Sequence, residues 1–132
     1  MILGVGLDLM DVSRLQRDLQ EKEGLRAELF TPVEIETCLH KRYPAQHFTA
    51  RFCAKEALFK ALGIGKRGKM SWQDIEISND AAGKPQVTLS GETRQCAARL
   101  GVSRIHLSLS HIRTAAVAVI ILETDKPIQE GL

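Results

Sequence analysis

Short hydrophobic runs alternate with amphipathic segments along the chain, and each pattern predicts one type of element. The apolar run 2–9 contains Gly4 and Gly6 and is typical of a buried strand that another backbone or a ligand approaches closely. Residues 11–20 carry valine and leucine on one helical face and arginine on the other, which predicts an amphipathic helix. The chain is therefore expected to begin with a strand followed by a helix.

The next segment contains clear signals for the start and the end of helices. Thr31 is a predicted N-cap, Pro32 suits the first helical position, and Glu34 completes a capping box. A longer helix is expected over residues 45–62, and Gly63 ends it. These signals place the helical part of the protein in the first half of the chain.

The second half of the chain is dominated by β-type patterns. Residues 71–78 alternate Trp72, Ile75 and Ile77 with polar residues, which predicts a strand. Further elements are strands over 85–90, 104–111 and 114–123, and a helix over 91–100 with Ser90 as its cap and Gly101 as its end. This order predicts a single α+β domain over residues 1–132, with a polar tail from residue 125.

Length, charge and cysteine content narrow the class of protein. The chain has 132 residues, which suits one domain, and its net charge of +2 comes without the basic block that nucleic-acid binders carry. No apolar run approaches the roughly 18 residues of a membrane span, and the N-terminus lacks a signal-peptide pattern. Three widely spaced cysteines fit neither a disulfide framework nor a zinc site. We expect a soluble cytoplasmic protein with reduced, buried thiols and with neither nucleic acid nor membrane as a partner.

The predicted helix at 45–62 has an apolar stripe that includes a charged residue. The stripe consists of Phe48, Phe52, Phe59 and Leu62. Lys55 points into it, where an ammonium group is costly unless it reaches solvent or finds a partner. Glu56 and Lys60 are four residues apart on an adjacent face, where a solvent-exposed ion pair is one explanation. This helix is the segment in which chemistry is most strongly indicated.

Asp8 is the other charged residue in an unusual place, because it closes an apolar run. One explanation is a helix cap for residues 11–20. The alternative is a metal ligand, since magnesium takes hard oxygen donors and commonly binds one or two carboxylates together with phosphates and water. Asp8 and Glu56 would supply such a pair if the first strand lies beside the long helix.

Motifs spread along the chain resemble one family. Gly6-x-Asp8 is followed by Arg14, and Arg-Phe-x-x-Lys-Glu-Ala-x-x-Lys at 51–60 is followed by Ala-Leu-Gly. Ile-His-Leu-Ser-Leu-Ser-His at 105–111 completes the set. In this order and spacing, from residue 2 to about residue 123, the motifs resemble holo-acyl-carrier-protein synthase, the short bacterial-type class of 4′-phosphopantetheinyl transferases.

The resemblance implies a fold, an activity and partners. The fold is α+β, with an antiparallel sheet against a long central helix, and members are typically homotrimers that bind coenzyme A between neighbouring subunits. The activity moves the 4′-phosphopantetheine group of coenzyme A onto a serine of apo acyl carrier protein, releases adenosine 3′,5′-bisphosphate, depends on Mg²⁺ and supports fatty acid biosynthesis. Val119 stands where the family often has a glutamine at the trimer axis, and an apolar residue also packs at such an axis.

The resemblance also implies roles for individual residues. Asp8 and Glu56 are the expected magnesium ligands, and Lys60 is expected to contact the diphosphate of coenzyme A. These three form the expected catalytic set, in which Glu56, directly or through a metal-bound water, accepts the serine proton. The residues expected to bind coenzyme A besides Lys60 are Arg51, Gly65, Lys66, Arg67 and His106, and those expected to contact the acidic helix of the carrier protein are Arg14 and Arg17.

Two other functions use the same features. A non-catalytic trimer could capture a nucleotide through the glycine-rich basic loop 63–69, which leaves Asp8, Glu56 and Lys60 without a role. A metal-dependent phosphohydrolase could use the same carboxylates and release free phosphopantetheine. Modification of an apo carrier protein distinguishes the transferase from both alternatives.

Overall fold

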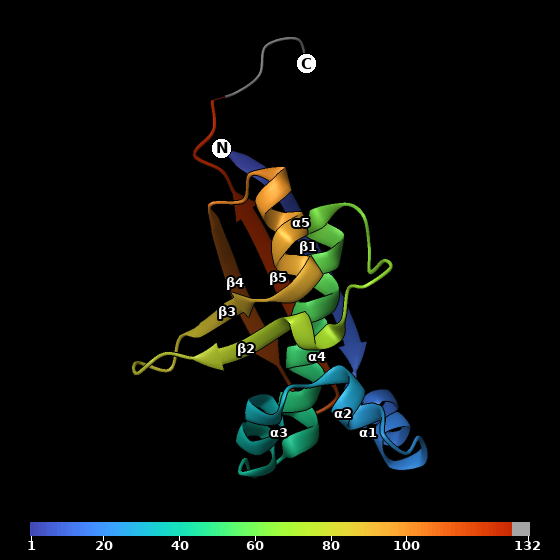
Figure 1. Ribbon diagram of the computed structural model, residues 1–132. Coiled ribbons are helices and arrows are strands. Elements are labelled where there is room, and N and C mark those ends of the chain that lie inside the picture. Colours follow the sequence, from blue (N-terminus) through green and yellow to red (C-terminus); the bar gives the residue numbers. More distant parts are fainter. Residues whose placement is uncertain (128–132) are drawn as a thin grey trace.

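A computed structural model describes residues 1–127, and they form an α+β fold, as the sequence predicts (Figure 1). Residues 128–132 of the predicted polar tail lie outside the described residues. In chain order the elements are β1 (Ile2–Asp11), α1 (Val12–Glu21), α2 (Leu25–Leu29), α3 (Pro32–Leu39), α4 (Pro44–Leu62), the 3-10 helix η1 (Trp72–Asp74), β2 (Ile75–Asn79), β3 (Pro85–Leu89), α5 (Gly91–Leu100), β4 (Arg104–His111) and β5 (Ala115–Glu123).

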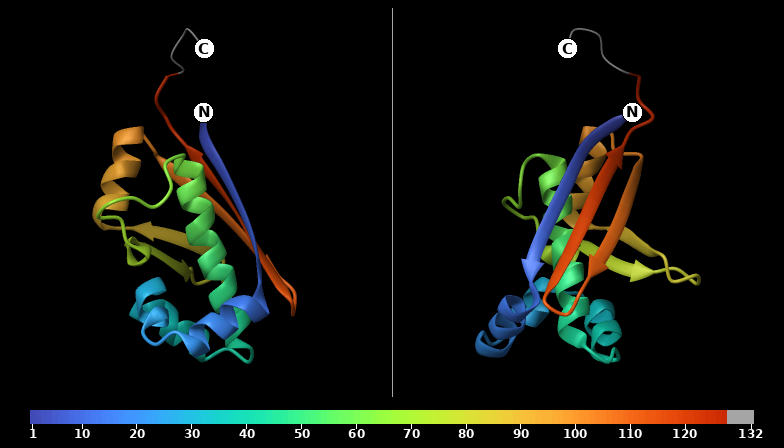
Figure 2. Two further views of the ribbon diagram at one scale, coloured as in Figure 1. Left: turned by 90° about the vertical axis from the view of Figure 1, so that its right-hand side faces the viewer. Right: turned by 180° about the vertical axis from the view of Figure 1, so that it is seen from behind.

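The central helix α4 lies between two β layers (Figure 2). Strands β1, β5 and β4 form an antiparallel sheet in that order, and α4 crosses one face of it. The β2–β3 hairpin and α5 lie on the opposite side of α4 (Figures 1 and 2). The alternation along β5 explains which face of the sheet the helix covers, because the residues on that face are small or apolar and buried: Ala116, Ala118, Ile120 and Leu122.

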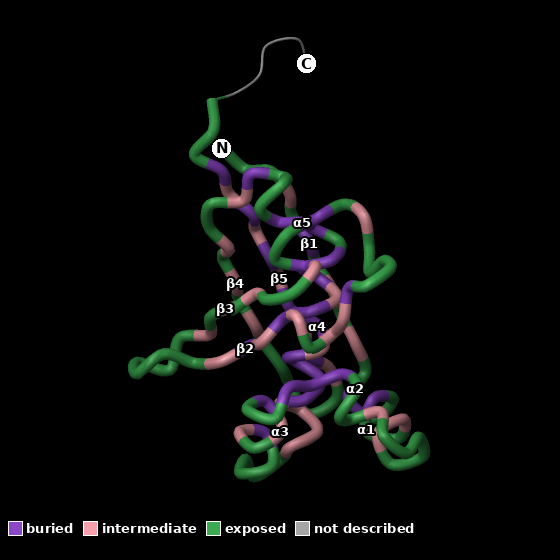
Figure 3. Tube along the Cα trace, in the orientation of Figure 1, coloured by how far each residue is buried: buried purple, intermediate pink, exposed green. Residues whose placement is uncertain are grey.

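The interior consists of two hydrophobic clusters that meet at α4. The larger cluster fills the space between α4, the sheet and α5. The smaller cluster joins α1, α2 and α3 to the first turns of α4 through Leu15, Leu29, Phe30, Cys38 and Phe48. Met10 and Trp72 pack against both clusters. Figure 3 shows the buried residues concentrated along α4, which therefore holds the two parts of the protein together.

Strand β1 and helix α4 approach so closely that side chains are excluded at the contact. A Cβ atom added to Gly4 would clash with the carbonyl oxygen of Ala61, and one added to Gly6 would clash with that of Ala57. The two glycines of the apolar run are thus explained by a close approach of two backbones. Because Asp8 follows Gly6 by two residues on the same face of the strand, this contact places Asp8 against the middle of α4.

Replacing Gly6 with alanine is expected to force β1 and α4 apart. The added methyl group meets backbone atoms that no side-chain rotation can move, so we expect a loss of about 1–3 kcal/mol in the free energy of unfolding. Thermal and urea unfolding measure it. Gln86→Ala is a suitable control, since it also introduces alanine in a strand but at an exposed position of β3. Unfolding of Gly6→Ala at the wild-type temperature would contradict the described contact.

Most of the predicted boundaries are confirmed. Thr31 caps α3, its side chain accepts a hydrogen bond from the Glu34 amide, and the Glu34 carboxylate accepts one from the Thr31 amide. Gly63 ends α4 in the left-handed region, with φ of 78°, and Gly101 ends α5 in the same way, with φ of 86°. The helix signals in the sequence are local, and they are read correctly because they do not depend on tertiary contacts.

Three local predictions differ from the structure. Trp72 is not a strand residue, because Ser71 and Asp74 form a capping box that winds residues 72–74 into η1 before β2 begins. Helix α2 was not predicted, since its five residues are too few to show a helical period. Ser90 occupies the N-cap position of α5, but its side chain makes no capping hydrogen bond.

The face of the sheet away from α4 is open, and it is apolar along β1 and β5 and polar along β4, which contributes His106, Ser108 and Ser110. Val5, Leu7 and Leu9 of β1 are 58%, 59% and 70% exposed. Their neighbours on β5 are Ile121, Val119 and Val117. No other element within residues 1–127 lies over this face, as the right-hand view of Figure 2 shows. Contiguous exposed apolar residues of this kind mark a contact surface. None of the described helices is long and apolar enough to cross a membrane.

Candidate active site

Asp8 lies within β1, on the side of the sheet that faces α4. Its partner in the sheet is Ala118 of β5, which is 1% exposed. Strand β1 continues to Asp11, and Asp11 occupies the N-cap position of α1. The explanation of Asp8 as a helix cap is therefore wrong, because the strand runs past the end of the apolar pattern.

The carboxylate of Asp8 is nearly enclosed and only partly satisfied. The side chain is 13% exposed, and Oδ1 accepts a hydrogen bond from Nζ of Lys60 at 3.0 Å. Oδ2 is buried and has no hydrogen-bond partner. Burying a carboxylate oxygen without a partner is costly, so this oxygen is available to coordinate a cation.

Lys60 belongs to the same site but does not form the exposed pair with Glu56 that its spacing allowed. Its ammonium group donates to the carbonyl oxygen of Leu7 at 3.1 Å as well as to Asp8. The side chain remains 54% exposed. Lys60 is therefore held at the edge of β1 while its charge still faces solvent, where an anionic ligand can reach it.

Glu56 lies one turn before Lys60 and lines a surface cavity together with Asp8. The cavity has a volume of about 510 Å³, and its charged lining residues are Asp8, Asp11, Arg14 and Glu56. Burial, followed by the negative charge of Asp8, raises the pKa of the Glu56 carboxyl, whereas Lys60 opposes this shift. The fold thus brings the carboxylates of the first strand and of the long helix into one cavity.

Asp8 and Glu56 suit a hard divalent cation. Two carboxylates in one cavity repel each other, and a cation between them removes that repulsion. Within residues 1–127 no group of three or more His, Cys, Asp or Glu side chains is arranged to hold a metal ion. A pair of carboxylates agrees with Mg²⁺, which commonly completes its coordination with phosphate oxygens and water.

Two neighbours of these carboxylates were not predicted from the sequence. Asp11 lines the cavity, whereas the sequence pattern around it predicts only the start of a helix. Cys53 is fully buried one turn before Glu56, and burial, followed by the charge of Asp8, raises the pKa of its thiol to about 12. The thiol is therefore protonated and is no nucleophile at neutral pH. All three cysteines are buried and free, as expected.

The exposed face of α1 lies next to this cavity. Arg14 and Arg17 are both exposed, on the face opposite the buried Val12 and Leu15. Arg14 lines the cavity of Asp8 and Glu56, so its guanidinium group is part of the site as well as of the surface. Arg17 is not among the residues that line it. The exposed face of α1 thus presents two guanidinium groups, one of them at the cavity.

The predicted nucleotide-binding loop follows α4 directly. Gly65, Lys66 and Arg67 lie between the end of α4 and η1, a few residues beyond Lys60. Nζ of Lys66 lies 5.9 Å from the centroid of the Trp72 ring, and Arg67 donates a hydrogen bond to the carbonyl oxygen of Ile64 at 2.6 Å. The loop is therefore anchored at one end to the helix that carries Glu56 and Lys60, although it does not line their cavity.

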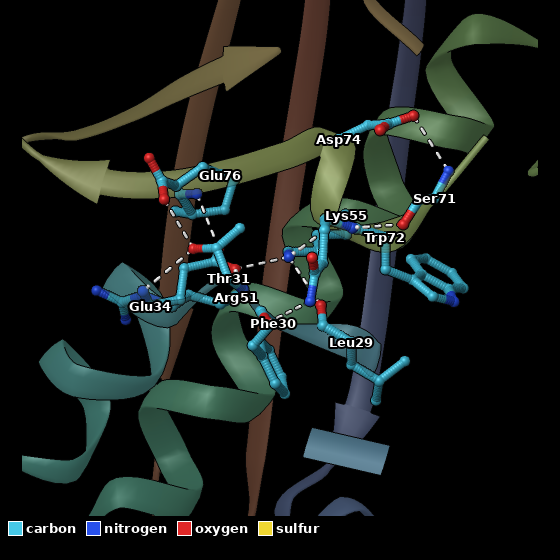
Figure 4. A network of polar contacts seen from close by, with 12 residues as sticks. Leu29, Phe30, Thr31, Glu34, Arg51, Lys55, Ser71, Trp72, Asp74 and Glu76 are labelled. Atoms are coloured by element: carbon cyan, nitrogen blue, oxygen red, sulfur yellow. Dashed lines mark hydrogen bonds and ion pairs between the residues drawn. The ribbon is translucent and has the colours of Figure 1, made fainter. Parts of the chain in front are cut away.

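Arg51 and His106 lie apart from the cavity of Asp8 and Glu56. Arg51 is 4% exposed, its Nε is buried without a hydrogen-bond partner, and Figure 4 shows its side chain beside Glu34 and Thr31. His106 lies on the open face of the sheet and pairs with Glu123 at 2.9 Å. Asp8 faces the other way, toward α4. Within one chain, His106 and the two carboxylates cannot contact the same small group.

Comparison with known proteins gives the chain a family. Residues 4–120 match the sequence model of the 4′-phosphopantetheinyl transferase superfamily. A holo-[acyl-carrier-protein] synthase from Geotalea daltonii is 49% identical over 124 residues, which cover 93% of this chain and 99% of that protein.

Solved structures agree in fold. A crystal structure of holo-[acyl-carrier-protein] synthase from Neisseria meningitidis superposes with a TM-score of 0.84 at 30% identity, over 94% of this chain and 100% of the other. The synthase from Bacillus anthracis, solved in complex with CoA (3′,5′-ADP), superposes with a TM-score of 0.78 at 31% identity, over 95% of this chain and 99% of the other. The chain belongs to the 4′-phosphopantetheinyl transferase superfamily.

Proposed function

We propose that this protein transfers the 4′-phosphopantetheine group of coenzyme A to a serine of an acyl carrier protein, with Mg²⁺ bound by Asp8 and Glu56. The observation that carries the proposal is the buried, unpartnered Oδ2 of Asp8 in the cavity that Glu56 also lines. The relatives named as holo-acyl-carrier-protein synthases support the choice of coenzyme A and carrier protein over other diphosphates and acceptors.

The reaction forms one bond and breaks one. The serine oxygen attacks the β-phosphorus of coenzyme A, the bond from that phosphorus to the bridging oxygen breaks, and adenosine 3′,5′-bisphosphate leaves with the bridging oxygen. Such transfers depend mainly on alignment and on neutralisation of phosphate charge. Mg²⁺, when bound, supplies positive charge at the diphosphate.

Three side chains at or beside the cavity are proposed to have different roles in the transfer. Lys60 is held by Leu7 and Asp8 with its ammonium group exposed, so it offers a positive charge to the diphosphate without reorganisation. Glu56 is proposed to accept the proton of the serine hydroxyl, since its carboxylate lines the cavity one turn from Lys60. Arg14 lies at the mouth of the same cavity, where the carrier protein must present its serine.

The open apolar face of the sheet supports a homotrimer. Val5, Leu7 and Leu9 are exposed on this face, and burial of such residues between subunits is favourable. His106 lies on the same face, so in an oligomer it belongs to the subunit interface. There His106 is proposed to contact the nucleotide of coenzyme A bound between subunits. The loop 63–69 and Arg51 are proposed to contact it as well, which for Arg51 requires its side chain, 4% exposed in the single chain, to become accessible in the complex. Sedimentation measures the number of subunits.

Arg14→Glu is expected to weaken binding of the carrier protein more than that of coenzyme A. The exposed guanidinium group lines the cavity, and reversing its charge directly opposes an acidic partner, whereas Lys60, the residue proposed to contact the diphosphate, keeps its own contacts with Leu7 and Asp8. Steady-state kinetics should give an increase of about tenfold or more in the KM for carrier and less than threefold in that for coenzyme A. Arg94→Glu, on the exposed face of α5, should change neither value. Equal increases in both would remove the docking role.

Mass spectrometry of the carrier protein tests the proposed function directly. Apo carrier protein incubated with the enzyme, coenzyme A and Mg²⁺ should gain the mass of one phosphopantetheine group. The gain should disappear with a chelator and return when Mg²⁺ is added in excess. A nucleotide-binding module would leave the carrier unchanged, and a phosphohydrolase would release free phosphopantetheine without modifying the carrier. Either result would contradict the proposed transferase activity and support the corresponding alternative.

A further inference from the structure

Lys55 is a buried charged residue for which the proposed reaction has no use. Its side chain is 0% exposed and lies at the edge of the aromatic stripe, with Nζ 5.3 Å from the centroid of the Phe30 ring. Nζ donates to Oε1 of Glu34 at 2.6 Å and to the carbonyl oxygens of Leu29 at 2.8 Å and Trp72 at 3.0 Å (Figure 4). Each of the three ammonium hydrogens thus has an acceptor.

Glu34 is buried as completely as Lys55 and is equally satisfied. Oε1 also accepts a hydrogen bond from the Thr31 amide at 2.9 Å, and Oε2 accepts one from the Ile77 amide of β2 at 2.8 Å. The Thr31 hydroxyl donates in turn to Glu76 of β2 at 2.7 Å. A fully satisfied ionic network in the interior holds its members in one geometry.

The acceptors of Lys55 come from segments on two different sides of the candidate site. Leu29 ends α2, within the helical corner formed by α1, α2 and α3, and α1 of this corner carries Arg14. Trp72 begins η1, immediately after the segment that contains the basic loop. Lys55 itself is the residue before Glu56 on α4. The ion pair therefore lies where three segments meet: the helical corner that carries Arg14, the end of the basic loop, and α4, which carries Glu56.

Hydrophobic packing alone leaves these segments less firmly placed. The helical corner has its own small cluster, which meets the main cluster through shared contacts of Met10 and Trp72. Apolar contacts are non-directional, so they tolerate small sliding and rotation between the two parts. Hydrogen bonds from one ammonium group to three segments are directional and fix the relative position of all three.

We propose that Lys55, through its ion pair with Glu34, is a positioning residue that sets the helical corner and the basic loop in register with Glu56 and Lys60. This inference rests on the proposed function. Transfer requires the serine oxygen and the β-phosphorus to be in line, and a misplacement of about 1 Å can reduce turnover by about 100-fold. Loss of the network is therefore expected to lower kcat more than it alters the binding of either substrate.

The test is a double variant in which both charged residues of the network are replaced, so that no buried charge is left. Lys55→Met alone would leave the buried Glu34 carboxylate without its counter-ion. It is therefore combined with Glu34→Gln, which keeps an oxygen that can accept a hydrogen bond from the amide of Thr31 or Ile77. The double variant, confirmed as folded by circular dichroism, should show a kcat about tenfold or more below wild type, with each KM changed by less than about threefold. Glu34→Gln alone leaves the Lys55 ammonium group with its two carbonyl acceptors but without its counter-ion, so it should lower the melting temperature and give a smaller decrease in kcat than the double variant.

Thr93→Val is the matched control. Thr93 is also fully buried, and its hydroxyl donates to Asp74 at 2.8 Å in a polar network that joins η1 to α5 without touching α4. It should lower the melting temperature and leave kcat within about twofold of wild type at temperatures well below unfolding. All variants are assayed against wild type by transfer to carrier protein.

The outcomes separate the two proposals. If wild type modifies no carrier protein, the proposed function fails. If wild type is active and the double variant is folded with wild-type kcat, the positioning role fails. It also fails if Thr93→Val, at an equal loss of melting temperature, lowers kcat as much as the double variant does. Should the double variant not fold, a wild-type kcat for Glu34→Gln would still overturn the proposal.

Discussion

Asp8→Asn and Glu56→Gln are each expected to reduce transfer of phosphopantetheine by about 1,000-fold or more. Each change removes one of the two carboxylates that line the cavity, and a metal ion at a phosphoryl centre contributes several kcal/mol, which corresponds to this factor. Both variants should remain folded. Asp8→Asn is expected to be as stable as wild type or more stable, because it removes a buried charge whose Oδ2 has no partner. Single-turnover kinetics and thermal unfolding measure the two effects.

A binding measurement distinguishes loss of the metal from loss of the fold. Isothermal titration of wild type with Mg²⁺ in the presence of coenzyme A should give a binding heat that both variants lack. Glu36→Gln, an exposed carboxylate on α3, should resemble wild type in both measurements. Near-normal turnover of either Asp8→Asn or Glu56→Gln would show that the assignment of the metal ligands is wrong.

Lys60→Met is expected to lower kcat by about 100-fold or more. The ammonium group is held in place by the carbonyl oxygen of Leu7 and by Asp8, so its charge acts on the diphosphate without reorganisation, and removal of one such group typically costs this much. The methionine side chain is unbranched like that of lysine, but it is one atom shorter and has neither the charge nor the hydrogen-bond donors of the ammonium group. Rapid-quench kinetics gives the rate constant of the chemical step separately from product release, and this rate constant should fall together with kcat.

The control for this variant is Lys84→Met, which removes a charge from the exposed turn between β2 and β3. It should leave kcat unchanged. If Lys60→Met raised only the KM for coenzyme A and kept kcat, Lys60 would bind the ground state and the transition state equally. Its role would then be that of a binding residue and not of a catalytic one.

The short-range features of the chain were predictable because they depend on neighbours in sequence. The capping box of Thr31 and Glu34 and the stop at Gly63 follow from backbone hydrogen bonding and from the left-handed conformation that glycine adopts easily. The alternation of β4 correctly predicted that His106 faces away from the apolar residues of that strand. The elements that the sequence did not predict are very short ones, α2 and η1.

The partner of Lys55 could not be predicted from the sequence. The stripe on α4 predicted that this lysine reaches solvent or finds a partner, and it finds Glu34, whose carboxylate was assigned only to a capping box. The Glu34 carboxylate both caps α3 and pairs with Lys55. Its Oε1 accepts hydrogen bonds from the Thr31 amide and from Lys55, and its Oε2 accepts one from the Ile77 amide. No spacing rule connects residues of α3, α4 and β2, since their contact depends on how the elements pack.

The family, the α+β class and the identity of the chemically capable residues were available from the order and spacing of residues alone, because helix ends, strand alternation and sequence motifs are properties of local stretches of chain. The meeting of Asp8 and Glu56 in one cavity and the partner of Lys60 were not. They follow from the contact of Gly4 and Gly6 with α4. That contact sets the distance between strand and helix, and long-range packing of this kind leaves no periodic trace in a sequence.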